Sequence, residues 1–181
     1  MSYEPKIKLL SLGGGAVGKT SLSTKWIKNE FYENYTPTIE EMFEKTVEIQ
    51  GKTYEVEITD TAGQDEFSSM KFRYISPSEG FIFVFSILEK KTFNELNGLY
   101  NDVITTKEKN FVPCVVIGNK GDLRNESCIE NQRGEELAQR FKTQYFETSA
   151  LNGTNVSEAF LFVIKQVINY RKGGGSCCQI Q

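Results

Sequence analysis

The segment GGGAVGKT, which runs from Gly13 to Thr20, limits the folds open to this chain more than any other stretch. It follows an apolar run and precedes a helical pattern. Its spacing fits G-x-x-x-x-G-K-[ST], with Gly18 and Lys19 near its end. A strand that turns through glycines into a helix gathers free backbone N–H groups at the positive end of the helix dipole. The segment therefore predicts a phosphate-binding turn between a strand and a helix.

Each residue type of this turn has a physical task. Gly13, Gly15 and Gly18 permit backbone angles and close approaches that a Cβ atom forbids. We expect Lys19 to neutralise the outer phosphates and the Thr20 hydroxyl to ligate Mg²⁺. A flexible glycine loop without a ligand is the alternative, and the flanking strand and helix patterns argue against it.

The composition fits one soluble globular domain. The 181 residues are enough for one well-buried core and too few for two ordinary domains. A net charge of −3 with scattered basic residues gives no footprint for nucleic acid. The absence of histidine excludes His-based triads and His–zinc sites. The 4 cysteines lack disulfide or zinc spacing and the start lacks a signal-peptide core, so we expect an intracellular setting.

Strand-like and helix-like runs alternate along the chain, which predicts an α/β fold with a mostly parallel sheet. The dipeptide Gln50-Gly51 predicts a hairpin between the second and third strands. Strands are expected at 7–12, 42–49, 53–59, 81–85, 112–117 and 144–147, and helices at 18–29, 90–107, 131–142 and from 156 onward.

The ends of these elements suggest how the domain is bounded. Asn155 is the expected cap of the last helix, with Glu158 three residues further on. Two long polar loops, 31–41 and 61–78, follow the glycine turn. We expect residues 1–172 to form the domain, and GGGSCCQIQ at 173–181 to form a flexible tail.

Three further motifs at strand ends indicate the nucleotide. NKGD follows a buried strand, at the carboxyl edge where open α/β sheets bind ligands. The Asp122 carboxylate can accept hydrogen bonds from guanine N1–H and the 2-amino group, a pair that adenine lacks. In DTAGQ, Asp60 could hold a water on Mg²⁺, and the Gly63 N–H could meet a terminal phosphate. In ETSAL, the Ala150 N–H could meet guanine O6.

The motifs GGGAVGKT, YTPTIEE, DTAGQDEFSSM, NKGD and ETSA, in this order and spacing, resemble the Ras family of small GTPases. The resemblance covers residues 5–170. It implies a P-loop NTPase G domain, whose six-stranded, mixed and mostly parallel sheet has helices on both faces. It also implies that GTP or GDP and Mg²⁺ bind at the carboxyl edge of the sheet.

The resemblance assigns roles to residues of these motifs. Thr20 and Thr38 would ligate Mg²⁺, and Asp60 would act on it through water. Gln64 would orient the attacking water, with Lys19 and Gly63 as the other catalytic residues. The nucleotide-binding residues that it implies are Gly13, Gly15, Ala16, Val17, Gly18, Lys19, Thr20, Ser21, Phe31, Tyr35, Thr38, Gly63, Asn119, Lys120, Asp122, Leu123, Ser149, Ala150 and Leu151.

Within that set, the base contacts are divided among three segments. Phe31 would lie against the guanine, and Asn119 and Asp122 would recognise it. Lys120 would brace the base and the loop, while Ser149 and its neighbour complete the pocket.

Several residues depart from the common patterns of related proteins. Leu151 stands where a lysine is common, and Thr36 and Met42 differ from common Ras effector-loop residues. Glu40 and Thr59 occupy positions where Rab relatives usually carry glycine and tryptophan. Between Asp122 and Ser149 there is no room for the extra helix typical of Rho relatives, so the Ras type is the better match.

The implied function is a molecular switch that hydrolyses GTP slowly and relays signals to effectors at a membrane. We expect a monomer whose exchange factors, GTPase-activating proteins and effectors bind residues 35–43 and 61–78. Strand 42–49 is expected at a sheet edge, where an effector could add a strand. Glu40 and Glu41 would favour a basic partner, unless they form only a solvated face.

Two other functions fit the glycine turn. A nucleotide-locked scaffold would bind without turnover, and Gln64 and Gly15 argue against it. A P-loop kinase would want an arginine-rich lid and would leave the NKGD motif without a task.

The chain closes on CCQIQ, which fits the C-a-a-X lipidation pattern. We expect a prenyl group on Cys178, farnesyl more than geranylgeranyl, and a palmitoyl group on Cys177 as the second anchor that one weak lipid requires. Double geranylgeranylation of the adjacent cysteines is the alternative. The expected location is the cytoplasmic face of a membrane, with the plasma membrane favoured.

Overall fold

The computed structural model describes residues 5–33, 38, 40–61 and 71–173. Its elements in chain order are β1 (Ile7–Leu12), α1 (Lys19–Lys28), β2 (Glu40–Ile49), β3 (Lys52–Thr61), α3 (Lys71–Ile75), β4 (Gly80–Ser86), α4 (Lys90–Lys107), β5 (Cys114–Asn119), the short 3₁₀ helix η1 (Gly121–Leu123), α5 (Asn131–Arg140), β6 (Tyr145–Glu147) and α6 (Val156–Arg171).

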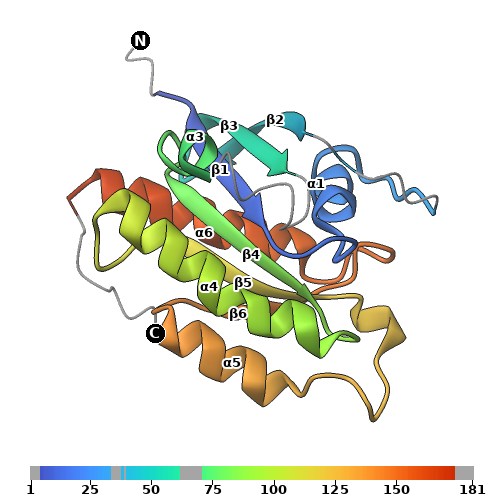
Figure 1. Cartoon of the computed structure of the whole chain (residues 1–181). Helices are drawn as coiled ribbons and strands as arrows, with labels where there is room; N and C mark the ends of the chain where they lie inside the picture. Colours follow the sequence, from blue (N-terminus) through green and yellow to red (C-terminus); the bar gives the residue numbers. More distant parts are fainter. Residues whose placement is uncertain (1–4, 34–37, 39, 62–70, 174–181) are drawn as a thin grey trace.

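The strands form one six-stranded sheet in the order β2-β3-β1-β4-β5-β6 (Figure 1). Only β2 and β3 pair antiparallel, and the other four pairs are parallel. The mixed, mostly parallel sheet confirms the predicted α/β fold class. The strand predicted at a sheet edge, β2, lies there, with β3 as its partner.

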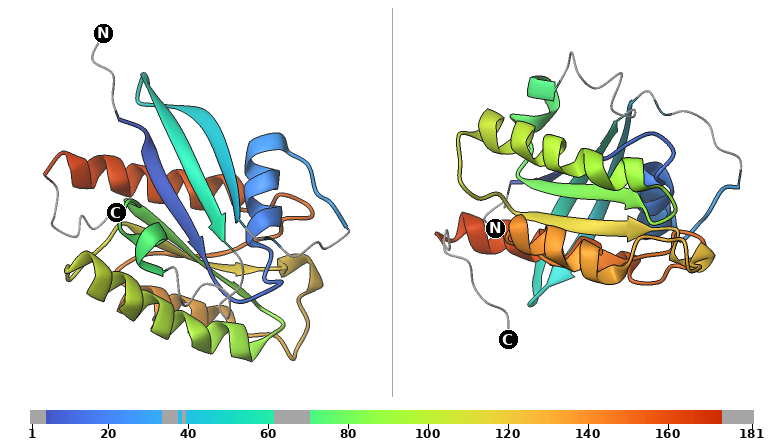
Figure 2. Two further views of the ribbon diagram at one scale, coloured as in Figure 1. Left: turned by 45° about the horizontal axis from the view of Figure 1, so that its top comes forward. Right: turned by 60° about the horizontal axis from the view of Figure 1, so that its bottom comes forward.

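Helices cover both faces of the sheet, as Figures 1 and 2 show. Helices α1 and α6 pack on one face, where the Trp26 and Phe160 rings stack with centroids 4.7 Å apart. Helices α3, α4 and α5 pack on the other, around Phe83 and Phe141. The strands β4 and β5 are buried between these layers, which explains their unbroken apolar sequences. Among the described residues, no helix is long and apolar enough to cross a membrane.

The β2–β3 turn confirms the predicted hairpin. Gln50 and Gly51 both have positive φ, 53° and 73°, and Ile49 pairs with Lys52 across the turn. Positive φ at both central residues is the geometry of a type I′ turn, whose twist matches that of the flanking strands.

Several predicted boundaries shift in the structure. Strand β2 begins at Glu40 and β3 continues to Thr61, while α3 lies inside the second predicted loop, so both polar segments are shorter than predicted. Strand β5 runs two residues later than predicted, because Pro113 has no N–H for the ladder and the pairing starts after it. The predicted tail lies outside the described residues, except for its first glycine.

The predicted cap of α6 is wrong. Asn155 has φ 54° and ψ 11°, in the left-handed region, and its side chain makes no cap hydrogen bond. Side-chain capping usually requires an extended cap residue. The Asn155 amide instead donates to the backbone oxygen of Glu147 at 2.8 Å, so it holds the preceding loop rather than the helix.

Candidate functional site

The glycine turn joins the end of β1 to α1 at the carboxyl edge of the parallel strands. A Cβ on Gly13 would lie 2.1 Å from the backbone oxygen of Val84 in β4. Gly18 has φ 97°, and a Cβ there would lie 2.3 Å from the side-chain nitrogen of Asn119 in β5. The turn therefore packs directly against the ends of β4 and β5. The close approach predicted at Gly15 is not found among the described residues, where an added Cβ meets no atom within 4 Å.

Lys19 folds back over this turn. Its ammonium donates to the backbone oxygens of Gly13 at 3.1 Å and Gly14 at 2.9 Å, and only 7% of the residue is exposed. Burial lowers the pKa of Lys19, and the nearby Asp60 and Glu95 carboxylates act in the opposite direction. A buried cation at the N-terminus of a helix is a favourable environment for a phosphate.

The other residues predicted in the turn differ in exposure. Ala16 is exposed and adopts a left-handed conformation with φ 57°. Val17 is buried in the core beneath α1 and α6, whereas Ser21 is half-buried in the first turn of α1. Within the turn, only Gly15 and Ala16 are exposed.

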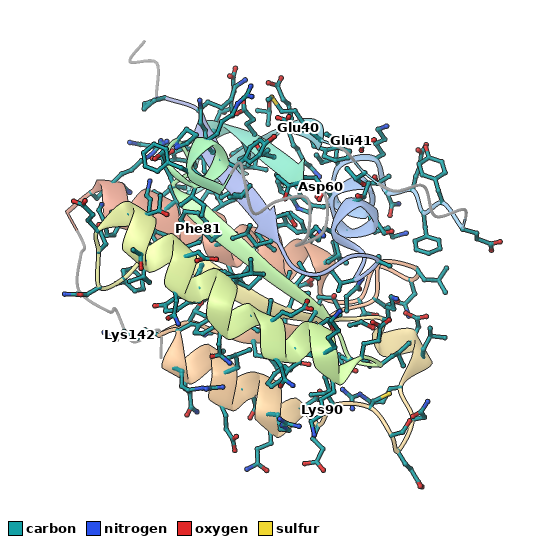
Figure 3. The ribbon with its side chains drawn as sticks, in the orientation of Figure 1. Glu40, Glu41, Asp60, Phe81, Lys90 and Lys142 are labelled. Atoms are coloured by element: carbon teal, nitrogen blue, oxygen red, sulfur yellow. The ribbon has the colours of Figure 1, made fainter. Side chains whose placement is uncertain are left out.

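A cluster of three oxygen-bearing side chains lies beside the turn. The Thr20 Oγ1 lies 2.7 Å from Thr38 Oγ1 and donates a hydrogen bond to Asp60 Oδ2. Asp60 is completely buried, and its Oδ1 has no hydrogen-bond partner within the part of the chain that the structure describes. Figure 3 shows Asp60 near Glu41, its cross-strand neighbour in β2.

The electrostatics of this cluster favour a cation. Burial raises the pKa of Asp60 to about 6, while the Thr20 hydrogen bond and Lys19 lower it and Glu41 raises it. Two hydroxyls and a carboxylate with a free, buried oxygen form the donor set that Mg²⁺ prefers. The residues present therefore fit the predicted magnesium site.

Asn119, the last residue of β5, links the glycine turn to two other loops. Its amide nitrogen donates to the backbone oxygen of Val17 at 3.0 Å. Its side-chain oxygen accepts from the Thr148 hydroxyl at 3.1 Å and from the Ala150 N–H at 3.3 Å. The NKGD motif thus contacts both the glycine turn and the ETSA motif. The Ala150 N–H, which was predicted to meet guanine, is directed at Asn119.

The loops 119–123 and 147–151 are joined a second time at Asp122. The Ser149 hydroxyl donates to Asp122 Oδ1 at 2.5 Å, which orients the carboxylate. Leu123 and Leu151, one from each loop, are 54% and 48% exposed and offer apolar surface to a planar ring.

Two backbone features shape the first of these loops. Lys120 is half-buried and takes φ 70°, in the left-handed region. The following residue, Gly121, donates its N–H to the Thr148 oxygen at 2.8 Å.

Of the remaining predicted residues, only Phe31 is described, and it is not brought into this geometry. Phe31 is half-buried and packs against the core of α1 and α6. Tyr35, Gly63 and Gln64 lie outside the described residues, as do Cys177 and Cys178.

Sequence reasoning missed Arg124, which pairs with Glu147 through two hydrogen bonds and joins the same two loops. The residues are 23 positions apart, and no motif spacing relates them. The hydrogen bond to Glu147 and the Glu147 charge raise the pKa of Arg124, so the guanidinium stays protonated.

The strand, glycine turn and helix form one unit with a buried lysine. This unit lies at the same sheet edge as the cluster of oxygen-bearing side chains that fits a cation. The arrangement defines a nucleotide-binding domain of the P-loop class. Residues 8–169 match the Ras family. The chain is 37% identical over 167 residues to the Ras-like protein rasB of Dictyostelium discoideum, covering 92% of this chain and 85% of the relative. It is also 37% identical over 165 residues to a Ras-like protein of Laccaria bicolor, covering 91% and 79%.

The chain belongs to the Ras family. It is therefore a small GTPase that binds guanine nucleotides, which confirms the family and the activity that the five motifs predicted.

Proposed function

We propose that this chain is a magnesium-dependent GTP/GDP switch that relays signals to effectors from the cytoplasmic face of a membrane. The cluster of Thr20, Thr38 and Asp60 carries the proposal. It joins the phosphate turn to the segment before β2 and to the end of β3. A change at the phosphates can therefore be transmitted to both segments.

In the GTP form, we propose that Thr38 is held next to Thr20 and that Gly63 donates its N–H to the γ-phosphate. A bound Mg²⁺ would be held by Thr20 and Thr38, with Asp60 acting through water, and would supply positive charge to the phosphates. Lys19 and the N–H groups of the turn stabilise the charge that develops in hydrolysis, while Gln64 aligns the attacking water. Loss of the γ-phosphate then releases both segments, and an arginine from an activating partner accelerates the reaction.

The partner surface is proposed at residues 35–43 and 61–78. Its described part includes the start of β2, a ten-residue edge strand whose outer side has no neighbouring strand in the sheet. Glu40 and Glu41 are exposed at that start. An effector that adds a strand here would gain main-chain hydrogen bonds, and basic side chains on it would match these carboxylates.

Membrane attachment is proposed through the tail. Prenylation at Cys178 and palmitoylation at Cys177 would together provide the two anchors that stable binding requires. This part of the proposal is supported by the C-a-a-X pattern alone.

The experiment that tests the guanine site is a titration of the purified chain with labelled GDP, ATP and XDP. We expect GDP to bind far more tightly than ATP, because only guanine pairs with both oxygens of Asp122. Asp122→Asn should weaken GDP by at least about tenfold and improve XDP, whose 2-oxo group matches the new amide.

Glu126→Gln, an equivalent change at an exposed position four residues away, is the matched control and should leave both affinities unchanged. Equal affinities of the parent chain for GDP and ATP would overturn the assignment of Asp122.

A further inference from the structure

The guanidinium of Arg124 binds three segments around the loop that carries Asp122. Its Nε donates to Glu147 Oε1 at 2.8 Å, and its Nη2 pairs with Glu147 Oε2. The Nη2 also donates to Asn131 Oδ1 at 2.7 Å, and the Nη1 donates to the backbone oxygen of Ile129 at 3.2 Å. Arg124 therefore ties the end of β6 and the start of α5 to η1.

The carboxylate that Arg124 holds lies against the turn before Asp122. A Cβ on Gly121 would be 3.0 Å from Glu147 Oε1, so the turn and this side chain are in close contact. The Gly121 N–H donates to the Thr148 oxygen at 2.8 Å, and the Arg124 N–H donates to the Gly121 oxygen at 3.2 Å. Movement of Glu147 would therefore be transmitted directly to the turn.

Asp122 depends on the same two loops. Its carboxylate is oriented by Ser149, two residues after Glu147. The hydrogen bond spans only 2.5 Å, so a small shift of one loop against the other would change the direction of the carboxylate. The Arg124–Glu147 pair is partly shielded, with side chains 33% and 22% exposed, and its two-point geometry resists such a shift.

We propose that Arg124 is a positioning residue for guanine recognition, which keeps Asp122 aligned with the base by clamping the loop 119–123 to the loop 147–151 through Glu147. Arg124 itself touches neither base nor phosphate in this role. The inference rests on the proposed function of Asp122. It adds that the Arg124–Glu147 pair influences both the selectivity for guanine and the rate of nucleotide release.

The opposite end of the sheet offers a matched control. Arg171 binds Glu79 through two hydrogen bonds of 2.8 and 2.6 Å. It also donates to the backbone oxygens of Pro5 and Lys6, which precede β1. The Arg171 and Glu79 side chains are 19% and 33% exposed, similar to the first pair. Removal of Arg171 should thus cost similar stability at the amino end of the strands, away from the proposed site.

The test compares the release of GDP with that of IDP, which lacks the 2-amino group and so loses one of the two contacts with Asp122. Release of labelled nucleotide from the full chain in Mg²⁺ is measured for the parent, Arg124→Ala, Arg124→Lys, Glu147→Gln and Arg171→Ala. Melting temperatures in excess GDP report the stability of each variant.

We expect Arg124→Ala to accelerate GDP release about tenfold and IDP release much less, so that the two rates converge. Arg124→Lys should fall between parent and alanine variant, because it keeps the charge but loses the two-point geometry. Glu147→Gln should act in the same direction as Arg124→Ala. Arg171→Ala should lower the melting temperature and leave the ratio of GDP to IDP release unchanged.

Equal acceleration of GDP and IDP in Arg124→Ala, unchanged rates, or the same convergence in Arg171→Ala would overturn the inference. If Arg124→Ala gives no folded protein, Glu147→Gln decides the question by the same ratio. A parent chain that holds ADP as firmly as GDP would instead refute the assignment of Asp122 itself.

Discussion

The hydroxyl oxygens of Thr20 and Thr38 lie 2.7 Å apart, although Thr20 is the second residue of α1 and Thr38 lies two residues before β2. This contact joins the phosphate turn to the segment that precedes the edge strand. If Thr38 is a ligand of Mg²⁺ only when the γ-phosphate is present, its hydroxyl contributes to the binding of GTP and not to the binding of GDP.

We therefore expect Thr38→Ala to weaken binding of a non-hydrolysable GTP analogue about tenfold and to leave GDP binding nearly unchanged. Thr20→Asn should instead impair Mg²⁺-dependent binding of GTP and favour an inactive form. Titrations at several Mg²⁺ concentrations distinguish the two, with Thr38→Ser as the control that retains the hydroxyl. Equal losses of GDP and GTP analogue in Thr38→Ala would contradict the role of Thr38.

Substitutions at Gln64 and Gly15 should separate binding from hydrolysis. Gln64→Leu is expected to keep GTP affinity but nearly abolish hydrolysis stimulated by an activating protein, since a leucine cannot orient water. Gly15→Val should act similarly, and the open space at Gly15 among the described residues allows the fold to accept the new side chain. Single-turnover phosphate release measures both, and stimulated hydrolysis at the parent rate in Gln64→Leu would show that its role is different.

The glycine turn should tolerate no side chain at Gly18. Alanine there is expected to destabilise the GDP-bound protein by about 2 kcal/mol or more, because its φ of 97° is strained for alanine and its Cβ would meet Asn119 at 2.3 Å. Gly98→Ala in α4 is the control, since an added Cβ meets none of the described atoms within 4 Å. It should stabilise the helix by about 0.5–1 kcal/mol.

Denaturant unfolding in excess GDP gives both values. A Gly18→Ala variant as stable as the parent would mean that the turn can relax away from β5.

The buried thiol of Cys114 should make stability fall at alkaline pH. Burial raises the pKa of Cys114 from 9.0 to about 12. Between these values the unfolded thiol loses its proton while the folded thiol keeps it, so the folded state binds more protons and stability decreases as pH rises. The expected slope from this group is about 1.4 kcal/mol per pH unit. Unfolding from pH 9 to 10.5 should show a shallower slope in Cys114→Ala than in the parent, and identical slopes would contradict the assignment.

The tail should decide where the protein resides. We expect Cys178→Ser to make the chain cytosolic, because the prenyl group is lost, and Cys177→Ser to leave it loosely and broadly membrane-associated. Cell fractionation with intact-mass measurement reports both location and modification. Membrane-bound chain with an unmodified Gln181 terminus would rule out this anchor.

Local patterns predicted most of the fold. The apolar runs at β4 and β5, the Gln50-Gly51 turn and the strand–glycine–helix unit each depend on neighbours in the chain, so periodicity and turn chemistry were sufficient. The motif residues that meet at the sheet edge were predicted because parallel strands bring their carboxyl ends together.

The sequence could not predict contacts that depend on how two loops pack against each other. Asn155 carries the residue type of a cap, yet its left-handed backbone directs the amide to Glu147. The Arg124–Glu147 pair depends on the path of η1 and on the length of the chain before α5, neither of which has a sequence signature. Gly15 and Gly18 look equivalent in the motif, and only the packing of β5 against the turn separates them.

The edge strand β2 also has a bearing on aggregation. An exposed ten-residue edge is a template on which a second copy could pair and begin a continuous sheet. Its exposed side chains include Glu40 and Glu41, which would meet like charges if two such edges paired. Self-association by this route is thus opposed by the same carboxylates that favour a basic partner. The negative charge of β2 therefore disfavours pairing with a second copy of this strand and favours pairing with a basic strand.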